Sequence, residues 1–149
     1  YTCCQHNDGH DSVPADDPLF YGMIGMHGVK SANYAINNCD LLILLGARVG
    51  DRAVTAISRL EGATVIHIDV DPAEIGKNLA ATIPVVGDVK NILEQLLECV
   101  KNYDHYDWKQ ELSEIKKAQD KPIEEEPEGC VNPKAFIRLL GQKLPDIPL

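Results

Sequence analysis

The sequence predicts an α/β protein built on a parallel β-sheet that has helices on both faces. Residues 41–45 (LLILL) and 64–69 (TVIHID) are short, unbroken apolar runs rich in strand-forming residues. Between them, residues 52–60 carry apolar side chains at helical spacing, which predicts a short crossover helix. Unbroken apolar strands joined through a helix are typical of a parallel sheet that is buried on both sides. Residues 83–86, which end at Gly87, are predicted to add a third strand.

The segment before the first of these strands is predicted to hold a glycine-rich loop and a helix. Residues 20–28 read FYGMIGMHG, and three glycines in so short an apolar stretch indicate close approach of the backbone to a neighbouring group. Ser31 is expected to cap a helix that runs to about Asn38. The inner face of that helix would carry Ala32, Ala35 and Ile36.

Two further helices are predicted by the residues that follow the second and third strands. Asp71 is expected to cap one helix, with Pro72 in its first turn and Glu74 reaching back as a capping box. Asp88 is expected to cap a helix that runs to about Lys101. The buried stripe of this second helix would consist of Val89, Ile92, Leu93, Leu96, Leu97 and Val100.

The last third of the chain is predicted to hold two helices separated by a charged linker. Residues 106–118 are amphipathic, and Leu112 lies on their apolar face. Residues 124–129 (EEEPEG) are expected to be a solvated linker. Asn132 and Pro133 are expected to open the last helix.

Composition limits the possible partners of the chain. The formal net charge of −9 argues against a nucleic-acid binder, which needs a basic surface, and against an anionic membrane. The longest apolar run, Leu41–Leu45, is too short to cross a bilayer, and no stretch has the pattern of a signal peptide. The five cysteines lack CxxC spacing and are expected to be free thiols in a reducing cytosol, so a cytoplasmic location is predicted.

The polar N-terminal segment has two interpretations. Cys3, Cys4, His6 and His10 are residue types that bind metals, but their spacing matches no zinc pattern. The alternative is a polar, poorly ordered terminus, and we expect no metal site in this chain.

The ends of the three predicted strands form the clearest candidate site. In an open parallel sheet, ligands bind beyond the carboxyl ends of the strands. Gly46 would let a phosphate or sugar approach the backbone, and Arg48 could pair with a phosphate. Asp69, at the end of the next strand, could accept hydrogen bonds from a ribose or an adenine amine. The pattern is not GxGxxG, so nucleotide binding and turns used only for packing both remain open.

No constellation of catalytic residues is visible. The serines lack the context of a nucleophile elbow. His67, in the middle of a predicted strand, is expected to be a hydrogen-bonded core histidine, whereas His27 lies in a glycine-flanked loop and is more open to a ligand. We therefore expect no catalytic residue in this chain.

Four stretches, taken in order, resemble the central domain of the acetohydroxyacid (acetolactate) synthase large subunit. They are PLFYGMIGMHG (18–28), NYAINNCDLLILLGARVGDR (33–52), HIDVDPAEIGKN (67–78) and GDV (87–89). Several long motifs in the same order are much more specific than any one of them.

The resemblance implies a domain division. Residues 19–103 would be the central nucleotide-binding domain, with a Rossmann-like parallel sheet flanked by helices and truncated at its N-terminal side. Residues 1–18 match the family poorly. Residues 104–129 would be a helix and an acidic linker, and residues 130–149 would begin the family's C-terminal thiamin-diphosphate domain.

The resemblance also implies a cofactor and its contacts. The family's enzymes condense two 2-keto acids on thiamin diphosphate and magnesium in branched-chain amino-acid biosynthesis, and their central domain holds FAD in a mainly structural role. The flavin would be touched by Gly25, Met26 and His27. The ribityl and pyrophosphate would be lined by Gly46, Ala47, Arg48 and Arg52. The adenosine end would be approached by Asp69, Val70, Glu74, Gly87 and Asp88.

Two departures from the family pattern affect what the chain can do. Gly50 stands where the family has an acid before the arginine, so one possible flavin contact is lost. The motifs that activate thiamin and hold magnesium are absent from this sequence, so the chain alone is expected to be inactive. The resemblance implies a nucleotide cofactor, the remaining domains of the parent subunit and a second copy of the chain as partners.

Two other classes of function remain open. One is a nucleotide-binding domain of the ADP type, or a purely structural domain, in another thiamin-diphosphate enzyme. The other is an NAD-dependent dehydrogenase domain, which the absence of GxGxxG disfavours. The preferred second keto acid cannot be read from the sequence.

Overall fold

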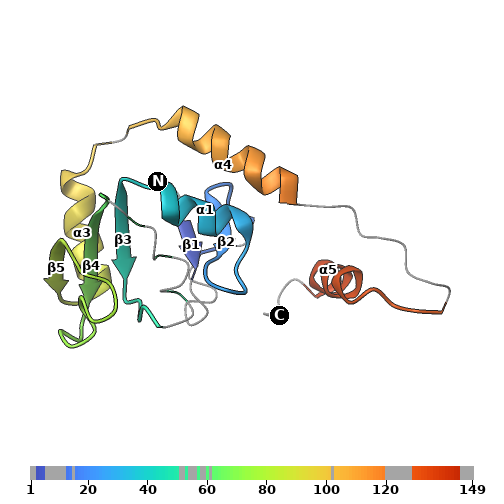
Figure 1. The fold of residues 1–149 in the computed structure, drawn as a ribbon, viewed down its shortest axis with the longest axis horizontal. Coiled ribbons are helices and arrows are strands. Elements are labelled where there is room, and N and C mark those ends of the chain that lie inside the picture. Colours follow the sequence, from blue (N-terminus) through green and yellow to red (C-terminus); the bar gives the residue numbers. More distant parts are fainter. Residues whose placement is uncertain are drawn as a thin grey trace.

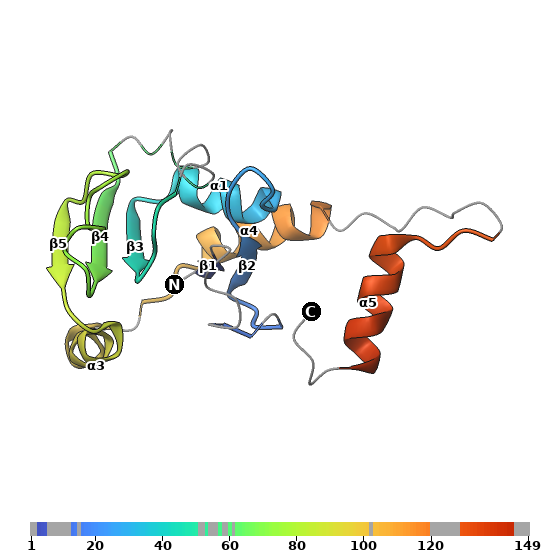
Figure 2. The same ribbon diagram turned by 90° about the horizontal axis from the view of Figure 1, so that it is seen from below.

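The computed structural model is an α/β fold with two parallel sheets (Figures 1 and 2). It describes residues 3–5, 13–14, 16–50, 53, 57, 60, 62–101, 103–119 and 129–144. Most of the crossover helix predicted between residues 52 and 60 and most of the linker at 124–129 lie outside the described residues.

The larger sheet contains the three predicted strands, β3 (Leu41–Leu45), β4 (Thr64–Asp69) and β5 (Ile83–Val86). Their order is β3-β4-β5 and both pairings are parallel, with Leu45 opposite Ile68 and Asp69 opposite Val86. In the central strand, β4, the last three residues are buried, as expected for a strand with neighbours on both edges. The predicted parallel sheet is therefore confirmed.

A second, two-stranded sheet pairs β1 (Cys3–Gln5) with β2 (Phe20–Met23), again in parallel. Neither strand was predicted from the sequence, because β1 is very short and β2 contains a glycine within its apolar residues. Figures 1 and 2 both place β1 on the β3 side of β2, so the free edge of β1 faces the free edge of β3.

The main core lies between the larger sheet and the segments that follow β2, β3 and β4. It consists of Ile36, Leu44, Val49, Ala53, Ile57 and Val65. Helix α1 (Lys30–Asn38) contributes Ile36, and Ala32 and Ala35 on the same inner face are also buried, as predicted. The predicted cap is wrong, however: Ser31 lies inside the helix, where its buried hydroxyl donates to the carbonyl of Tyr21 at 2.8 Å.

Helix α4 (Tyr106–Gln119) packs across α1 and β2 and forms a second cluster with them. Leu112, which the sequence placed on the apolar face, is fully covered against Tyr21 and Ala35. Polar contacts support the same interface, since the Lys116 ammonium donates to the carbonyl of Phe20 at 2.7 Å. Figure 1 shows α4 running beside α1.

Helix α3 (Val89–Cys99) begins as predicted but is not buried as predicted. Asp88 caps it by accepting from the N–H of Asn91 at 3.0 Å. None of its residues is buried, and Leu97 is 77% exposed. The side chains of Val89 and Ile92, at the start of α3, lie beside Gly46 and Gly87 at the end of the sheet.

The last helix, α5 (Pro133–Lys143), confirms the predicted start. The side chain of Asn132 accepts from the N–H groups of Lys134 and Ala135, and Pro133 occupies the first turn. Figures 1 and 2 both show α5 apart from the two sheets. Among the described helices, none has the length and apolar character needed to span a membrane.

The cysteines with described thiols form no disulfide. Cys39, Cys99 and Cys130 are free, and Cys39 donates to the carbonyl of Ile36 at 3.2 Å. Burial raises the pKa of the Cys39 thiol, so it stays protonated and unreactive at neutral pH. The prediction of free thiols is confirmed for these three residues.

Candidate nucleotide-binding site

The carboxyl ends of β3, β4 and β5 meet at one edge of the sheet. The N–H of Gly46 donates to the carbonyl of Ile68 at 2.8 Å, and the N–H of Gly87 donates to the carbonyl of Asp69 at 2.9 Å. These two bonds continue the sheet ladder by one residue on each side of β4. Gly46, Asp69 and Gly87 are therefore neighbours, as the sequence predicted from their positions after the strands.

Asp69 holds the central position at this edge. Its side chain is 8% exposed, and Oδ1 accepts from the N–H of Asp71 at 2.9 Å. Within the described part of the chain, no donor to Oδ2 is present. A carboxylate has acceptor capacity on both oxygens, so Asp69 can still accept hydrogen bonds from hydroxyl or amine groups of a ligand.

Residues 70–80, between β4 and β5, form successive turns, so the helix predicted from Asp71 is wrong. The carboxylate of Asp71 accepts from the N–H of Ala73 at 2.9 Å, which is a turn around an aspartate rather than a helix cap. Glu74 does not reach back to Asp71; it pairs with Lys77 at 3.0 Å. Local side-chain bonds of this kind compete with helix formation, which explains the outcome.

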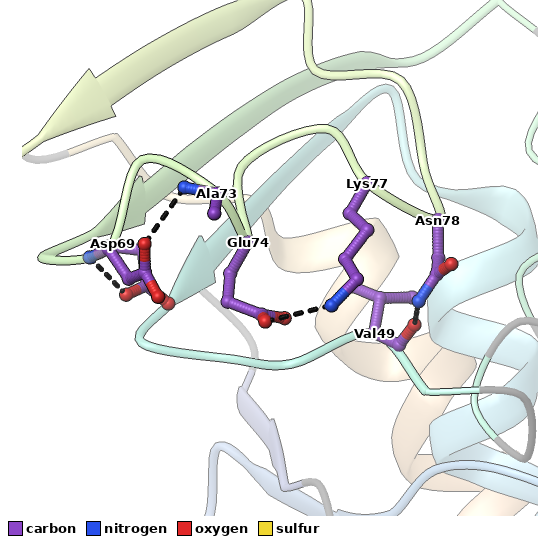
Figure 3. A network of polar contacts seen from close by, with 7 residues as sticks. Val49, Asp69, Ala73, Glu74, Lys77 and Asn78 are labelled. Atoms are coloured by element: carbon purple, nitrogen blue, oxygen red, sulfur yellow. Dashed lines mark hydrogen bonds and ion pairs between the residues drawn. The ribbon is translucent and has the colours of Figure 1, made fainter.

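Two contacts fix these turns to the rest of the site. The Nδ2 of Asn78 donates to the carbonyl of Val49 at 2.6 Å and so joins the segments after β3 and β4 (Figure 3). The N–H of Gly76 donates to Nδ1 of the buried His67 at 3.3 Å. The burial predicted for His67 is confirmed, but among the described residues its Nε2 has no hydrogen-bond partner, so the ring is hydrogen-bonded there through Nδ1 alone.

The loop at residues 24–28, which we call the 24–28 loop, follows β2 and leads into α1 (Figure 1). It is closed by two backbone bonds, from Gly28 to the carbonyl of Gly25 at 2.9 Å and from Val29 to the carbonyl of Met23 at 2.8 Å. Its tip carries Met26, which is 64% exposed, and His27, which is also exposed. The side chains of Met26 and His27 are thus exposed to solvent on a loop whose backbone is closed by two hydrogen bonds.

All three loops are anchored on the main core. Ile24 of the 24–28 loop, Ala47 after β3 and Leu79 after β4 pack against it. Apolar residues that pack on one cluster hold their loops in fixed relative positions. Each of the three segments is therefore attached to the main core by one apolar side chain.

The other residues predicted for the site differ in their exposure and in the contacts that they make. Arg48 and Val70 are exposed, and Asp88 also serves as the cap of α3. Arg52 lies outside the described residues. His6 and His10, two of the four residues considered for a metal site, lie outside them as well, and no group of three or more metal-binding side chains occurs in the described part.

Sequence reasoning missed Asn33 and Asn78, whose amides brace the loops of the site. Asn33 had a detectable signal, since asparagine is a poor helix former and yet lies within the first turns of α1. Asn78 had none, because an amide side chain in a polar loop is ordinary.

Gly50 offers a stability test at this site. A side chain added there would meet no atom within 4 Å, and the backbone is not left-handed. Gly62 has the same open space but a φ of +82°. We expect Gly50→Ala to raise the free energy of unfolding by about 0.4–1 kcal/mol by restricting the unfolded chain. We expect Gly62→Ala to lower it by about 1–2 kcal/mol, because a left-handed backbone disfavours a Cβ. Urea denaturation measures both changes; shifts in the same direction would contradict the assigned backbone conformations.

The parallel sheet, the flanking helices and the glycine turns after β3 and β5 define a Rossmann-like α/β domain. Residues 3–96 match the family described as thiamine pyrophosphate enzyme, central domain, and the chain belongs to this family. The resemblance drawn from the sequence motifs is confirmed.

Several curated relatives are similar to the chain over most of its length. A probable acetolactate synthase large subunit of Methanocaldococcus jannaschii is 42% identical over 93% of this chain and 24% of the relative. The acetolactate synthase isozyme 2 large subunit of Escherichia coli is 40% identical over 72% of the chain and 19% of the relative. The chloroplastic acetolactate synthase 2 of Zea mays is 42% identical over 73% of the chain and 18% of the relative. The chain thus spans about a quarter or less of the length of these relatives.

Proposed function

We propose that this chain is the FAD-binding central domain of an acetolactate synthase large subunit. The observation that carries the proposal is that Gly46, Asp69 and Gly87 are neighbours at the carboxyl ends of β3, β4 and β5. Ligands of open parallel sheets bind at this edge. The segments after β2, β3 and β4 also share one apolar cluster, on which Ile24, Ala47 and Leu79 pack. The relatives named above carry the name of acetolactate synthase, which supports the choice of enzyme.

The residues present fit FAD. The carboxylate of Asp69, with one oxygen used, suits the hydroxyls of a ribose, and the backbone at Gly46 leaves room for a close approach. The exposed guanidinium of Arg48 suits a pyrophosphate. Met26 and His27 offer an apolar contact and a polar contact at the flavin end. FAD bound here would contribute mainly structural support.

Other predicted residues would act through the backbone or from the rim of the site. Ala47 would contribute a backbone contact, because its side chain packs on the main core, and the buried Gly25 would set the shape of the 24–28 loop. Val70, Glu74, Gly87 and Asp88 would surround the adenosine, and Arg52 would join Arg48 at the pyrophosphate.

The test is a titration of the 149-residue chain with FAD, with ADP in parallel, by flavin fluorescence quenching and calorimetry. We expect saturable FAD binding, and binding about 10- to 100-fold weaker in Arg48→Ala, since a charge-assisted bond to phosphate is lost. Lys143→Ala removes the same charge from α5 and should leave FAD binding unchanged. Binding of neither nucleotide by the wild-type chain would overturn the proposal.

A second function, a nucleotide-binding module of the ADP type, is favoured by one observation. Gly50 stands where the family has an acid, and nothing in the structure fills its place. Binding of ADP without FAD would select this second function. Gly50→Asp, which the open space accommodates, should then restore some FAD affinity if the missing acid is the cause.

The activity of the whole protein is part of the same proposal. A parent acetolactate synthase would condense two 2-keto acids in branched-chain amino-acid biosynthesis, in the cytoplasm, with thiamin diphosphate and Mg²⁺ held by its other domains. This chain alone would be inactive. An acetolactate assay that detects turnover by the purified chain would contradict this division of roles.

We propose that a second copy of the chain is also a partner. Strand β5 pairs with β4 on one edge only within the described residues, and its Ile83 and Val86 are 46% and 60% exposed. An unpaired apolar edge favours association. Analytical ultracentrifugation should show concentration-dependent dimers that Ile83→Lys weakens and Val131→Lys, at a 71% exposed site before α5, does not. A monomer at all concentrations would contradict this prediction.

A further inference from the structure

Asn33, on the second turn of α1, makes a paired contact with the backbone of one residue of the 24–28 loop. Its Oδ1 accepts from the N–H of Gly25 at 2.9 Å, and its Nδ2 donates to the carbonyl of Gly25 at 3.0 Å. A single amide side chain thus satisfies both backbone polar groups of one residue. The two bonds together fix the orientation of Gly25, which is buried and has a φ of +108°.

Asn33 is itself held firmly. Its backbone N–H donates to the carbonyl of Val29 at 3.1 Å, and its carbonyl accepts from the side chain of Asn37 at 2.7 Å. The amide that is hydrogen-bonded to the loop therefore projects from a helix whose inner face is buried against the core. A rigid support of this kind holds a loop in one conformation before a ligand arrives.

We infer that Asn33 is a positioning residue, which holds the 24–28 loop in the shape that receives the flavin half of FAD; this inference rests on the proposed function. Asn33 acts through Gly25 and does not touch the ligand. The loop presents Met26 and His27, so the flavin end depends on its shape. The adenosine end is held by β3, β4 and β5 and does not depend on Asn33. A loop that is ordered in advance loses less conformational entropy on binding and so binds more tightly.

FAD and ADP share the adenosine half, but a role of Asn33 in positioning the loop predicts different effects on the binding of the two. Without the two hydrogen bonds from Asn33, the loop must be ordered when FAD binds, so the affinity for FAD falls. ADP lacks the flavin and should not sense the change. A residue that merely stabilised the domain would affect both ligands alike.

The experiment is calorimetric titration of the 149-residue chain and its variants with FAD and, separately, with ADP. Asn33→Leu keeps the approximate size and removes both hydrogen bonds. We expect its Kd for FAD to rise about tenfold while its Kd for ADP stays within about twofold of the wild-type value. Asn33→Asp keeps the acceptor for the N–H of Gly25 and should fall between wild type and Asn33→Leu, so it also serves if Asn33→Leu does not fold. The visible circular dichroism of bound flavin should weaken in the same order.

Asn38→Leu is the matched control. Asn38 lies on the same helix, and its amide donates to the carbonyl of Tyr34 within that helix. Both ligands should bind this variant as they bind the wild-type chain. Equal weakening of FAD and ADP in the Asn33 variants, or no weakening of either, would overturn the positioning role while leaving FAD binding in place. A wild-type chain that binds ADP but not FAD would overturn the proposed function and this inference together.

Discussion

Leu112→Ala is expected to lower the free energy of unfolding by about 2–5 kcal/mol, the cost of removing a fully buried leucine from a packed core. Leu112 is 0% exposed and lies between α4, α1 and β2, where Tyr21 and Ala35 are its buried neighbours. The truncation leaves a cavity, because hydrogen bonds on either side of it hold α4 in place. Before Leu112, the hydroxyl of Tyr21 donates to the carbonyl of Lys109, and after it Lys116 donates to the carbonyl of Phe20. Urea denaturation followed by circular dichroism measures the change.

Leu97→Ala is the matched control for that prediction. The same side chain is truncated in the same type of element, but Leu97 on α3 is 77% exposed. Its loss should change stability by less than about 0.5 kcal/mol. Similar losses in the two variants would mean that α4 does not pack on α1 and β2 in solution, or that α3 is covered by a partner.

The sequence was sufficient to predict the larger sheet because its strands are unbroken apolar runs, a pattern that burial on both faces requires. Residues 41–45, 64–69 and 83–86 were each located within the observed bounds. The same logic failed for α3, whose apolar stripe indicates a surface to be covered but not whether that surface is present. Leu97 and Val100 were expected inside and are exposed.

Local capping signals gave a mixed result, and the reason is physical. Asp88 and Asn132 cap helices as predicted, because apolar residues at helical spacing follow them. Asp71 has an equally good cap sequence, but the left-handed backbone at Gly76, with a φ of +74°, interrupts the segment that follows, and Asp71 forms a turn instead. Capping residues stabilise a helix that packing already favours; they do not create one.

The candidate site was predictable where it depends on strand ends and unpredictable where it depends on loop bracing. Gly46, Asp69 and Gly87 were found from their positions after the strands, since carboxyl ends of parallel strands share one edge. The contacts of Asn33 with Gly25 and of Asn78 with Val49 join residues that only the folded chain brings together. No periodicity in the sequence encodes such pairs. The assignment of the individual site residues to FAD stays a prediction.

Gly28→Ala is expected to lower the free energy of unfolding by about as much as Leu112→Ala, but through a steric clash and not through a cavity. The backbone at Gly28 is not left-handed, so alanine is excluded by space alone. Its Cβ would lie 2.4 Å from the carbonyl oxygen of Met23 and 2.5 Å from the carbonyl carbon of Ile24. Both atoms belong to the backbone, so no side chain can move aside. The loop must open, and we expect a loss of about 2–4 kcal/mol of stability, near the upper range for overpacked sites.

The opening of the loop also predicts a functional consequence. The bonds from Gly28 to Gly25 and from Val29 to Met23 close the 24–28 loop, and a Cβ at Gly28 disrupts both. FAD affinity should therefore fall further in Gly28→Ala than in Asn33→Leu, whereas Gly50→Ala, which adds a methyl group in open space, should retain it. Denaturation and FAD titration of the same three proteins measure both effects. A Gly28→Ala variant within about 0.5 kcal/mol of wild type would mean that the loop shifts without strain. In that case its closed shape could not be what the flavin requires, and a role for Asn33 in holding that shape would lose its basis.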